Sequence, residues 1–205
     1  MRAHVRLLLA SSNAGKLREY RAMSAGREIE VDSLAKFSGL PEFPEDSPTF
    51  AENAAGKALH YARFAEEIVF ADDSGLVVPA LGGAPGVRSA RYAGANASDA
   101  ERVAKLLDEM RGKSGEARAA KFVCVIAAAR QGRMLAIVSD AAEGVIAEAP
   151  RGRAGFGYDP VFYFTARKRT FAGLSEAEKH EVSHRGRAFR KLIEYLKENL
   201  FTPTL

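Results

Sequence analysis

Apolar runs that alternate with helical segments constrain the fold of this chain more than any other feature of its sequence. Short apolar runs are typical of buried strands, and longer segments with a 3.6-residue repeat are typical of helices. Strand-like runs occupy 5–12, 27–34 and 68–78, helical segments occupy 13–25, 49–65, 97–112 and 175–200, and residues 121–148 resemble two or three strands. This order predicts an α/β or mixed α+β fold with an elongated central sheet. We expect one domain, 1–205.

Local signals indicate where some of these elements begin and turn. Thr49 and Ser98 each precede a glutamate by three residues, which is the spacing of a capping box at a helix N-terminus. Asn53, Lys57 and His60 share one face of the helix predicted to start at Thr49. The pair Gln131-Gly132 lies between two apolar runs and predicts a β-hairpin.

Two adjacent carboxylates interrupt the apolar run VFADDSGLVV. Asp72 and Asp73 lie where burial is expected, and a buried carboxylate is unfavourable unless a positive group pairs with it. Glu45 lies in the preceding proline-rich loop. Carboxylates of this kind suit Mg²⁺, which takes one or two of them together with water and substrate phosphates. The simpler alternatives stay open: a solvated loop acid for Glu45 and a capped turn for the aspartates.

The stretch SSNAGK, residues 11–16, joins a predicted strand to a predicted helix. The N-terminus of a helix binds anions through its free N–H groups, and Lys16 adds a positive charge. A phosphate site is one interpretation, and a plain turn capped by Asn13 is the other. The stretch is not a P-loop, because Ala10 and Leu17 stand where that motif requires Gly and Ser or Thr.

Two further clusters carry residues suited to ligand binding. In GFGYDP, glycines allow close approach of a flat ligand, and Phe156 or Tyr158 can stack on a base. The alternative is a tight turn with core aromatics. In EKHEVSHRGRA, Lys179, His184 and Arg185 place donors on or beside one helix, where the alternative is an ordinary basic face.

The composition of the chain limits the kinds of partner that we expect it to bind. The net charge of +4 is compatible with a polyanionic small molecule, and no basic stripe interleaved with aromatics indicates nucleic acid. The single cysteine, Cys124, lies in an apolar run, so we expect a buried, inert thiol and no disulfide. No apolar run reaches transmembrane length, and we expect a cytoplasmic protein without a membrane partner.

The order of these motifs resembles the inosine/xanthosine triphosphate pyrophosphatases, also called non-canonical purine NTP pyrophosphatases. The matching stretches are SSNAGK, FAENAAGKA, ADDSGLVVPALGGAPGVRSARYAG, GFGYDPVF and LSEAEKHEVSHRGRA. The resemblance implies Mg²⁺-dependent hydrolysis of ITP, dITP and XTP to the monophosphate and pyrophosphate. It also implies a homodimer, and a fold of two lobes around a long mixed sheet flanked by helices, with the active-site cleft between the lobes.

The same resemblance implies roles for individual residues. Glu45 and Asp73 match metal ligands, and Asp73 also matches the base that activates water, whereas Asp72 is left open between a metal contact and a supporting role. The positions that match nucleotide contacts are Ser11, Ser12, Asn13, Ala14, Gly15, Lys16, Lys57, Ser74, Phe156, Gly157, Tyr158, Asp159, Lys179, His184 and Arg185.

Two rival functions are weighed beside this one. A house-cleaning pyrophosphatase for modified pyrimidine triphosphates would use similar chemistry on another base. A non-catalytic nucleotide- or RNA-binding module is favoured by the positive charge alone. The acids Glu45, Asp72 and Asp73 argue against RNA, because without a metal they would repel backbone phosphates.

Overall fold

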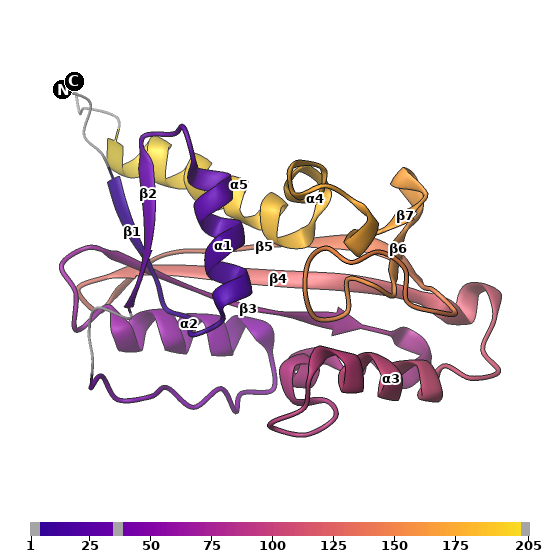
Figure 1. The fold of residues 1–205 in the computed structure, drawn as a ribbon. Coiled ribbons are helices and arrows are strands. Elements are labelled where there is room, and N and C mark those ends of the chain that lie inside the picture. Colours follow the sequence, from indigo (N-terminus) through magenta and orange to yellow (C-terminus); the bar gives the residue numbers. More distant parts are fainter. Residues whose placement is uncertain (1–4, 35–38, 202–205) are drawn as a thin grey trace. The chain divides into compact units, whose positions relative to one another are not determined.

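The computed structural model describes residues 5–34 and 39–201, which form the strands and helices drawn in Figure 1. The strands are β1 (Val5–Leu9), β2 (Ile29–Ser33), β3 (Ile68–Val77), β4 (Ala119–Arg130), β5 (Arg133–Ile146), β6 (Phe162–Phe164) and β7 (Arg169–Thr170). The α-helices are α1 (Ala14–Ser24), α2 (Phe50–Tyr61), α3 (Asp99–Glu109), α4 (Glu176–Val182) and α5 (His184–Leu196), and a π-helical turn, Lys197–Phe201, follows α5. Short 3₁₀ segments are Pro79–Leu81, Gly86–Arg91, Gly115–Arg118, Thr165–Arg167 and Phe171–Gly173.

The described strands form one sheet in the order β2-β1-β3-β4-β5-β6-β7. β1 pairs in parallel with both β2 and β3, as strands joined through crossover helices do. β6 pairs antiparallel with β5 and with β7. The mixed α/β class, with helices flanking a central sheet, is therefore confirmed.

The chain divides into two compact units, and β3, β4 and β5 contribute residues to both. The described part of unit 1 consists of residues 5–34, 39–73, 124–140 and 185–201. Unit 2 consists of residues 74–123 and 141–184. The division separates Asp73 from Ser74 and His184 from Arg185, so each of these neighbouring pairs is shared between units.

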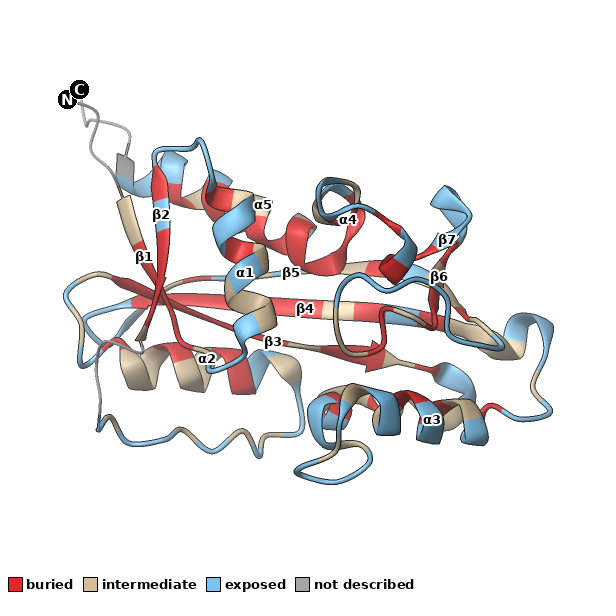
Figure 2. Cartoon of the chain, in the orientation of Figure 1, coloured by how far each residue is buried: buried red, intermediate tan, exposed pale blue. Residues whose placement is uncertain are grey.

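The core of unit 1 is formed by strands packed against helices. Leu7 and Leu9 of β1, with Phe70 of β3, are fully buried. Tyr20 of α1 and Phe189 of α5 pack on them, and the two rings meet edge-on with centroids 5.0 Å apart. In Figures 1 and 2, α1 and α5 lie on one side of these strands and α2 lies on the other, with buried residues facing the sheet.

Unit 2 has its own core, in which aromatic rings dominate. Phe122, Phe162 and Phe171 are in contact, with centroids 4.7 to 5.8 Å apart. Leu106 of α3 and Val182 of α4 complete this cluster from the helices. Burying rings of this size contributes much of the favourable free energy of folding, because each removes a large apolar area from water.

Several predicted boundaries are confirmed. The Ser98 side chain accepts from Glu101 N and the Glu101 carboxylate accepts from Ser98 N, which forms the predicted capping box of α3. Thr49 caps α2 by accepting from Glu52 N at 3.2 Å. The hairpin between β4 and β5 turns through Gln131 and Gly132, both with positive φ, as in a two-residue type I′ turn.

The prediction of a single helix over 175–200 is wrong in one respect. The backbone of Ser183 is extended (φ −72°, ψ 155°) and separates α4 from α5, although no proline marks the break. The interruption places His184 at the first position of a new helix, α5.

Within the described ranges, no helix has both the length and the apolar character needed to cross a membrane.

Candidate active site

The turn from β1 into α1 places a lysine at a helix N-terminus in unit 1. Asn13 caps α1, and its side-chain oxygen accepts from Lys16 N at 3.0 Å. Ser11 Oγ accepts from Asn13 N at 3.2 Å, which fixes the turn. The N–H groups of Ala14 and Gly15 belong to the first helical turn, which has no intrahelical acceptors. The cap expected from the plain-turn interpretation is therefore present, together with the helix terminus that phosphate binding requires.

Asp72 is fully buried and pairs with two cations. Its Oδ1 lies 2.9 Å from Lys16 Nζ, and its Oδ2 accepts from Arg185 Nε at 3.1 Å. Arg185 Nη1 also donates to Glu19 Oε2 at 2.7 Å. Burial by itself raises the pKa of Asp72, but Lys16 and Arg185 outweigh it and hold that pKa well below its ordinary value. Asp72 is therefore ionised throughout the physiological range.

Asp73, the next residue of β3, has different surroundings. Asn53 Nδ2 donates to its Oδ2 at 2.9 Å, and the residue is 8% exposed. Burial raises the pKa of Asp73 to about 6, the charges of Glu45 and Asp72 add to the rise, and Asn53 and Lys16 oppose it. Consecutive side chains of a strand point to opposite faces, which is why neighbouring aspartates meet different partners.

The loop that carries Glu45 is tied to α2. Lys57 Nζ forms an ion pair with Glu45. Asn53 binds both backbone polar groups of Ser47, because its Oδ1 accepts from Ser47 N at 3.0 Å and its Nδ2 donates to Ser47 O at 3.3 Å. Phe43 packs against Gly56 so closely that a Cβ there would lie 2.4 Å from the ring. One helix face thus holds the Glu45 loop and also contacts Asp73.

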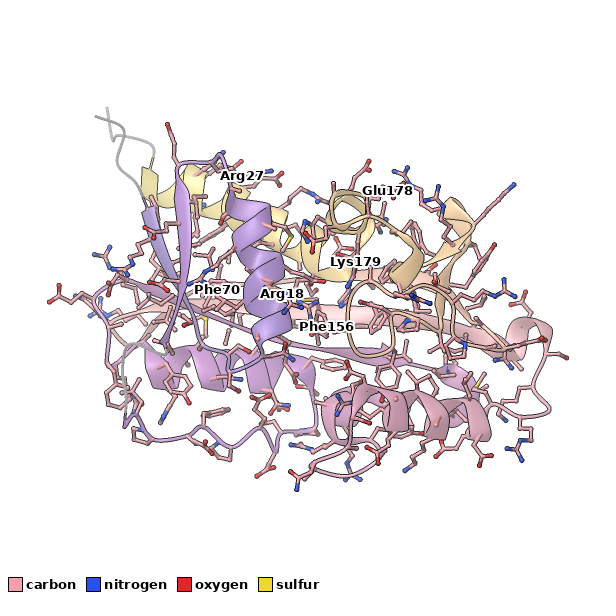
Figure 3. All side chains as sticks on the ribbon, in the orientation of Figure 1. Arg18, Arg27, Phe70, Phe156, Glu178 and Lys179 are labelled. Atoms are coloured by element: carbon pink, nitrogen blue, oxygen red, sulfur yellow. The ribbon has the colours of Figure 1, made fainter. Side chains whose placement is uncertain are left out.

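In unit 2, a buried ion pair lies beside an aromatic ring. Lys179 Nζ of α4 pairs with Asp159 and lies 5.0 Å from the centroid of the Phe156 ring (Figure 3). Asp159 Oδ2 also accepts from Phe156 N at 2.9 Å. Gly155 adopts a φ of +77°, and a Cβ there would lie 2.0 Å from Asp159 Oδ2. Asp99 Oδ2 accepts from Gly157 N at 2.7 Å, so two carboxylates fix this loop.

The remaining predicted residues of unit 2 lie nearer the core. Tyr158 is 3% exposed and donates to Ser89 O at 3.0 Å, whereas Phe156 is only partly buried. His184 is buried with its ring stacked on Phe122, the centroids lying 4.6 Å apart. Ser74 is partly buried and follows Asp73 directly in β3. Of the two aromatic residues expected to stack on a base, Phe156 is therefore the more accessible.

Comparison with known proteins places these features in a family. The family model described as the Ham1 family matches residues 7–195. The protein belongs to the Ham1 family. This Ham1-family chain is 51% identical over 192 residues to the dITP/XTP pyrophosphatase of Geobacillus kaustophilus, with 94% of each chain covered. It is 46% identical to the dITP/XTP pyrophosphatase of Desulfotalea psychrophila, with 95% of this chain and 89% of the relative covered.

Solved Ham1 structures agree with the fold. A HAM1 protein from Coxiella burnetii superposes with a TM-score of 0.84 at 43% identity, covering 95% of this chain and 99% of the other. The Ham1 protein of Staphylococcus aureus superposes with a TM-score of 0.82 at 36% identity, covering 94% and 98%. At this identity the likeness extends beyond the fold to the sequence, and the family resemblance inferred from the motifs is confirmed.

Two contacts of the candidate site have no signal in the sequence. Asn53 shares a predicted helix face with Lys57, but nothing in that spacing indicates a bond to Asp73. No motif includes Glu19, although this side chain pairs with Arg185 across 166 positions of sequence. No local pattern reports a contact between residues so distant along the chain, and a family alignment would be the only sequence signal able to find it.

Proposed function

We propose that this protein hydrolyses non-canonical purine nucleoside triphosphates (dITP, ITP and XTP) to the nucleoside monophosphate and pyrophosphate. The observation that carries the proposal is the arrangement in unit 1 of Lys16, at the N-terminus of α1, with Asp73, whose pKa is raised to about 6. The first supplies positive charge for a polyphosphate, and the second supplies a base. Relatives named dITP/XTP pyrophosphatases support the choice of substrate.

The reaction assigns one step to each group. Asp73 takes a proton from a water molecule, whose oxygen bonds to the α-phosphorus. The bond from that phosphorus to the bridging oxygen breaks, and the oxygen leaves with pyrophosphate. Lys16 and the first-turn N–H groups of Ala14 and Gly15 offset the negative charge that develops on the leaving group. At neutral pH the carboxylate of Asp73 is ionised before reaction and can accept the proton.

A magnesium ion is proposed as the cofactor, with Glu45 and Asp73 as its protein ligands. Across the described residues, no group of three or more His, Cys, Asp or Glu side chains is arranged to hold a metal. Two carboxylates nevertheless suit Mg²⁺, which takes the rest of its ligands from water and phosphates. The charge of Glu45 adds to the rise in the pKa of Asp73, and a cation near both carboxylates would offset this repulsion. When bound, the ion supplies positive charge against the triphosphate and lowers the pKa of water.

The aromatic cluster of unit 2 has the groups that base recognition needs. The Phe156 ring offers a face for stacking, and Lys179 offers a donor beside it. Hypoxanthine and xanthine carry a carbonyl at C6, which accepts a hydrogen bond, whereas adenine carries an amino group, which donates one. A donor left facing that amino group costs about 1–3 kcal/mol. We assign discrimination against adenine to such a mismatch.

The proposed function is tested with a panel of triphosphates and detection of pyrophosphate. We expect release from dITP, ITP and XTP to exceed release from ATP and GTP, and to stop when EDTA removes divalent ions. Methylated pyrimidine triphosphates in the same panel test the pyrimidine alternative. Release of orthophosphate instead of pyrophosphate would contradict cleavage at the α-phosphorus.

Two further properties are proposed with this function. A homodimer is proposed from the family resemblance, and light scattering coupled to gel filtration measures its mass against 22.1 kDa for one chain. A cytoplasmic location is proposed because free nucleotides are made there, and cell fractionation tests it. Finding the protein in the membrane or periplasmic fraction would contradict this location.

A further inference from the structure

Asp72 belongs to a network of four charged side chains within unit 1. Lys16 and Arg185 contact its two carboxylate oxygens, and Glu19 contacts the other end of the Arg185 guanidinium at 2.7 Å. The Asp72 side chain is 0% exposed, and that of Arg185 is 4% exposed. Two cations and two carboxylates balance, which is the condition under which buried charges are tolerated.

The contacts of Lys16 orient its ammonium group. Such a group has three N–H bonds and no acceptor. Lys16 Nζ donates one of them to the Asp72 backbone carbonyl at 3.2 Å and lies 2.9 Å from Asp72 Oδ1 in an ion pair. Both contacts hold the ammonium group against Asp72. The Lys16 side chain is 14% exposed while Asp72 is not exposed at all, so a ligand can approach the ammonium only from the side away from Asp72.

Both oxygens of Asp72 already face cations of the protein, Lys16 on one and Arg185 on the other. A metal ligated by Asp72 would have to displace one of them and would lie in a region without solvent access. Asp73, by contrast, accepts a hydrogen bond from a neutral amide, Asn53 Nδ2, at 2.9 Å. The adjacent aspartates are therefore suited to different tasks.

We propose that Asp72 is a positioning residue that aims the Lys16 ammonium at the polyphosphate, and that Arg185 and Glu19 hold Asp72 in place. This inference rests on the proposed function and adds to it a role for Asp72. A lysine has a flexible four-carbon stem, and fixing its end in advance removes a rearrangement that would otherwise accompany each reaction.

The proposal predicts different effects of a substitution at Asp72 on kcat and on KM. Replacing Asp72 by Asn removes a negative charge next to Lys16, and Coulomb attraction alone then favours a polyanion at least as much as before. The same change releases the ammonium from its fixed direction, which weakens stabilisation of the leaving group. We therefore expect Asp72→Asn to lower kcat for dITP by about tenfold to a hundredfold without raising KM.

The matched control is Asp140→Asn. Asp140 also pairs with a lysine, Lys191, at 2.9 Å in unit 1, but that lysine side chain is 52% exposed. We expect its kcat to stay within about twofold of the wild-type value. An unchanged kcat in folded Asp72→Asn would overturn the proposal. So would a loss of Mn²⁺ affinity equal to that of Asp73→Asn, measured on the nucleotide-free protein, because Asp72 would then be a metal ligand.

A second readout does not depend on catalysis. The ¹H–¹⁵N signal of the Lys16 ammonium, assigned by its loss in Lys16→Arg, reports whether that group is held. We expect a sharp signal in the wild type that shifts on adding inorganic tripolyphosphate in EDTA, and a broadened signal with a weaker response in Asp72→Asn. An identical signal and response in both proteins would contradict positioning. Failure of wild-type turnover with these signals intact would refute the proposed function alone.

Arg185→Lys keeps the charge balance and serves if Asp72→Asn does not fold. A lysine lacks the forked guanidinium that reaches both Asp72 and Glu19. We expect kcat to fall by a similar factor for dITP and for the slow substrate dATP, with broadening of the Lys16 signal. An unchanged kcat would overturn the role of Arg185 as a support. A loss confined to dITP would also overturn it and would favour direct contact with the base.

Discussion

Asp72 and Asp73 are consecutive residues of one strand, yet their surroundings give their carboxyl groups opposite properties. Burial raises the pKa of both. For Asp72 the effect is reversed by Lys16 and Arg185, whereas for Asp73 it is reinforced by Glu45 and by Asp72 itself. Pairs of acids whose pKa values are pushed apart are typical of sites where one acts as a base and the other supplies fixed charge.

Replacing Asp73 by Asn tests its assignment as the base. We expect pyrophosphate release from dITP to fall by about a hundredfold to ten-thousandfold, because the amide cannot accept the proton of water. The Asn53 contact survives, since the new side chain keeps a carbonyl oxygen as acceptor. Circular dichroism checks the fold, and substantial remaining activity in a folded variant would remove the assignment.

The same residue predicts a dependence of stability on pH. The pKa of Asp73 rises from 3.8 to about 6 on folding, so the folded protein binds more protons than the unfolded chain between these values. Protonation of Asp73 therefore stabilises the folded state fully below about pH 4, and this stabilisation is lost as pH rises through about 6. The free energy of unfolding decreases by about 2–3 kcal/mol as a result. Urea unfolding in EDTA at about pH 4.5 and pH 8 measures it. Asp73→Asn is expected to be the more stable protein at the higher pH, and equal pH dependence in both would contradict the expectation.

At the scale of elements, α2 is the part of unit 1 that organises the acids. Its Asn53 side chain is 1% exposed and bonds both to Ser47, in the loop after Glu45, and to Asp73 on β3. Lys57, one turn further along the helix, pairs with Glu45 itself. The two proposed metal ligands thus depend on one helix face, although they come from a loop and a strand distant in sequence.

Asn53→Ala is expected to destabilise the protein by about 1–3 kcal/mol, because Ser47 N and Asp73 lose buried partners. It is also expected to weaken Mn²⁺ binding by about tenfold, measured by calorimetry on nucleotide-free protein, since the loop with Glu45 is released. The control is Asn199→Ala, whose amide donates to the nearby Tyr195 carbonyl in an exposed setting. Metal affinity unchanged in Asn53→Ala would show that the helix face does not position the ligands.

The loop of unit 2 between β5 and β6 gives a matched pair of glycines. Gly155 and Gly157 both have positive φ, but a Cβ meets the Asp159 carboxylate only at Gly155. Gly157→Ala should cost about 1–2 kcal/mol from backbone strain alone. Gly155→Ala should lower the free energy of unfolding by about 1–3 kcal/mol more than Gly157→Ala does, because the carboxylate that binds Phe156 N and Lys179 must move. Equal losses in urea unfolding would contradict the clash.

The whole molecule combines two units, each with its own hydrophobic core, and a ligand bound to the folded state stabilises the chain by mass action. A non-hydrolysable dITP analogue with Mg²⁺ at about a hundred times its Kd should add about 2.7 kcal/mol. This corresponds to a rise in Tm of about 5–10 °C for a chain of this size. Differential scanning calorimetry measures the rise in Tm. The same rise with the adenine analogue at the same concentration would contradict selectivity for the base.

Much of this molecule could be predicted from local patterns. The caps at Thr49 and Ser98 and the hairpin at Gln131 depend on residues within a few positions of each other, so the sequence signal is direct. The break at Ser183 was not predicted, because both flanking segments have helical composition and only the structure shows the extended residue between them.

The fold class, the family and the list of polar residues at the ends of apolar strands can be predicted from the sequence, because they follow from periodicity and from motifs in a fixed order. Which acid faces which cation depends on how the chain packs in three dimensions. Asp72 and Asp73 are equivalent in a sequence pattern, but strand pleating turns them to different sides, one to Lys16 and Arg185 and one to Asn53. Contacts between residues more than a hundred positions apart, such as Arg185 with Asp72, arise from packing and have no local sequence signal.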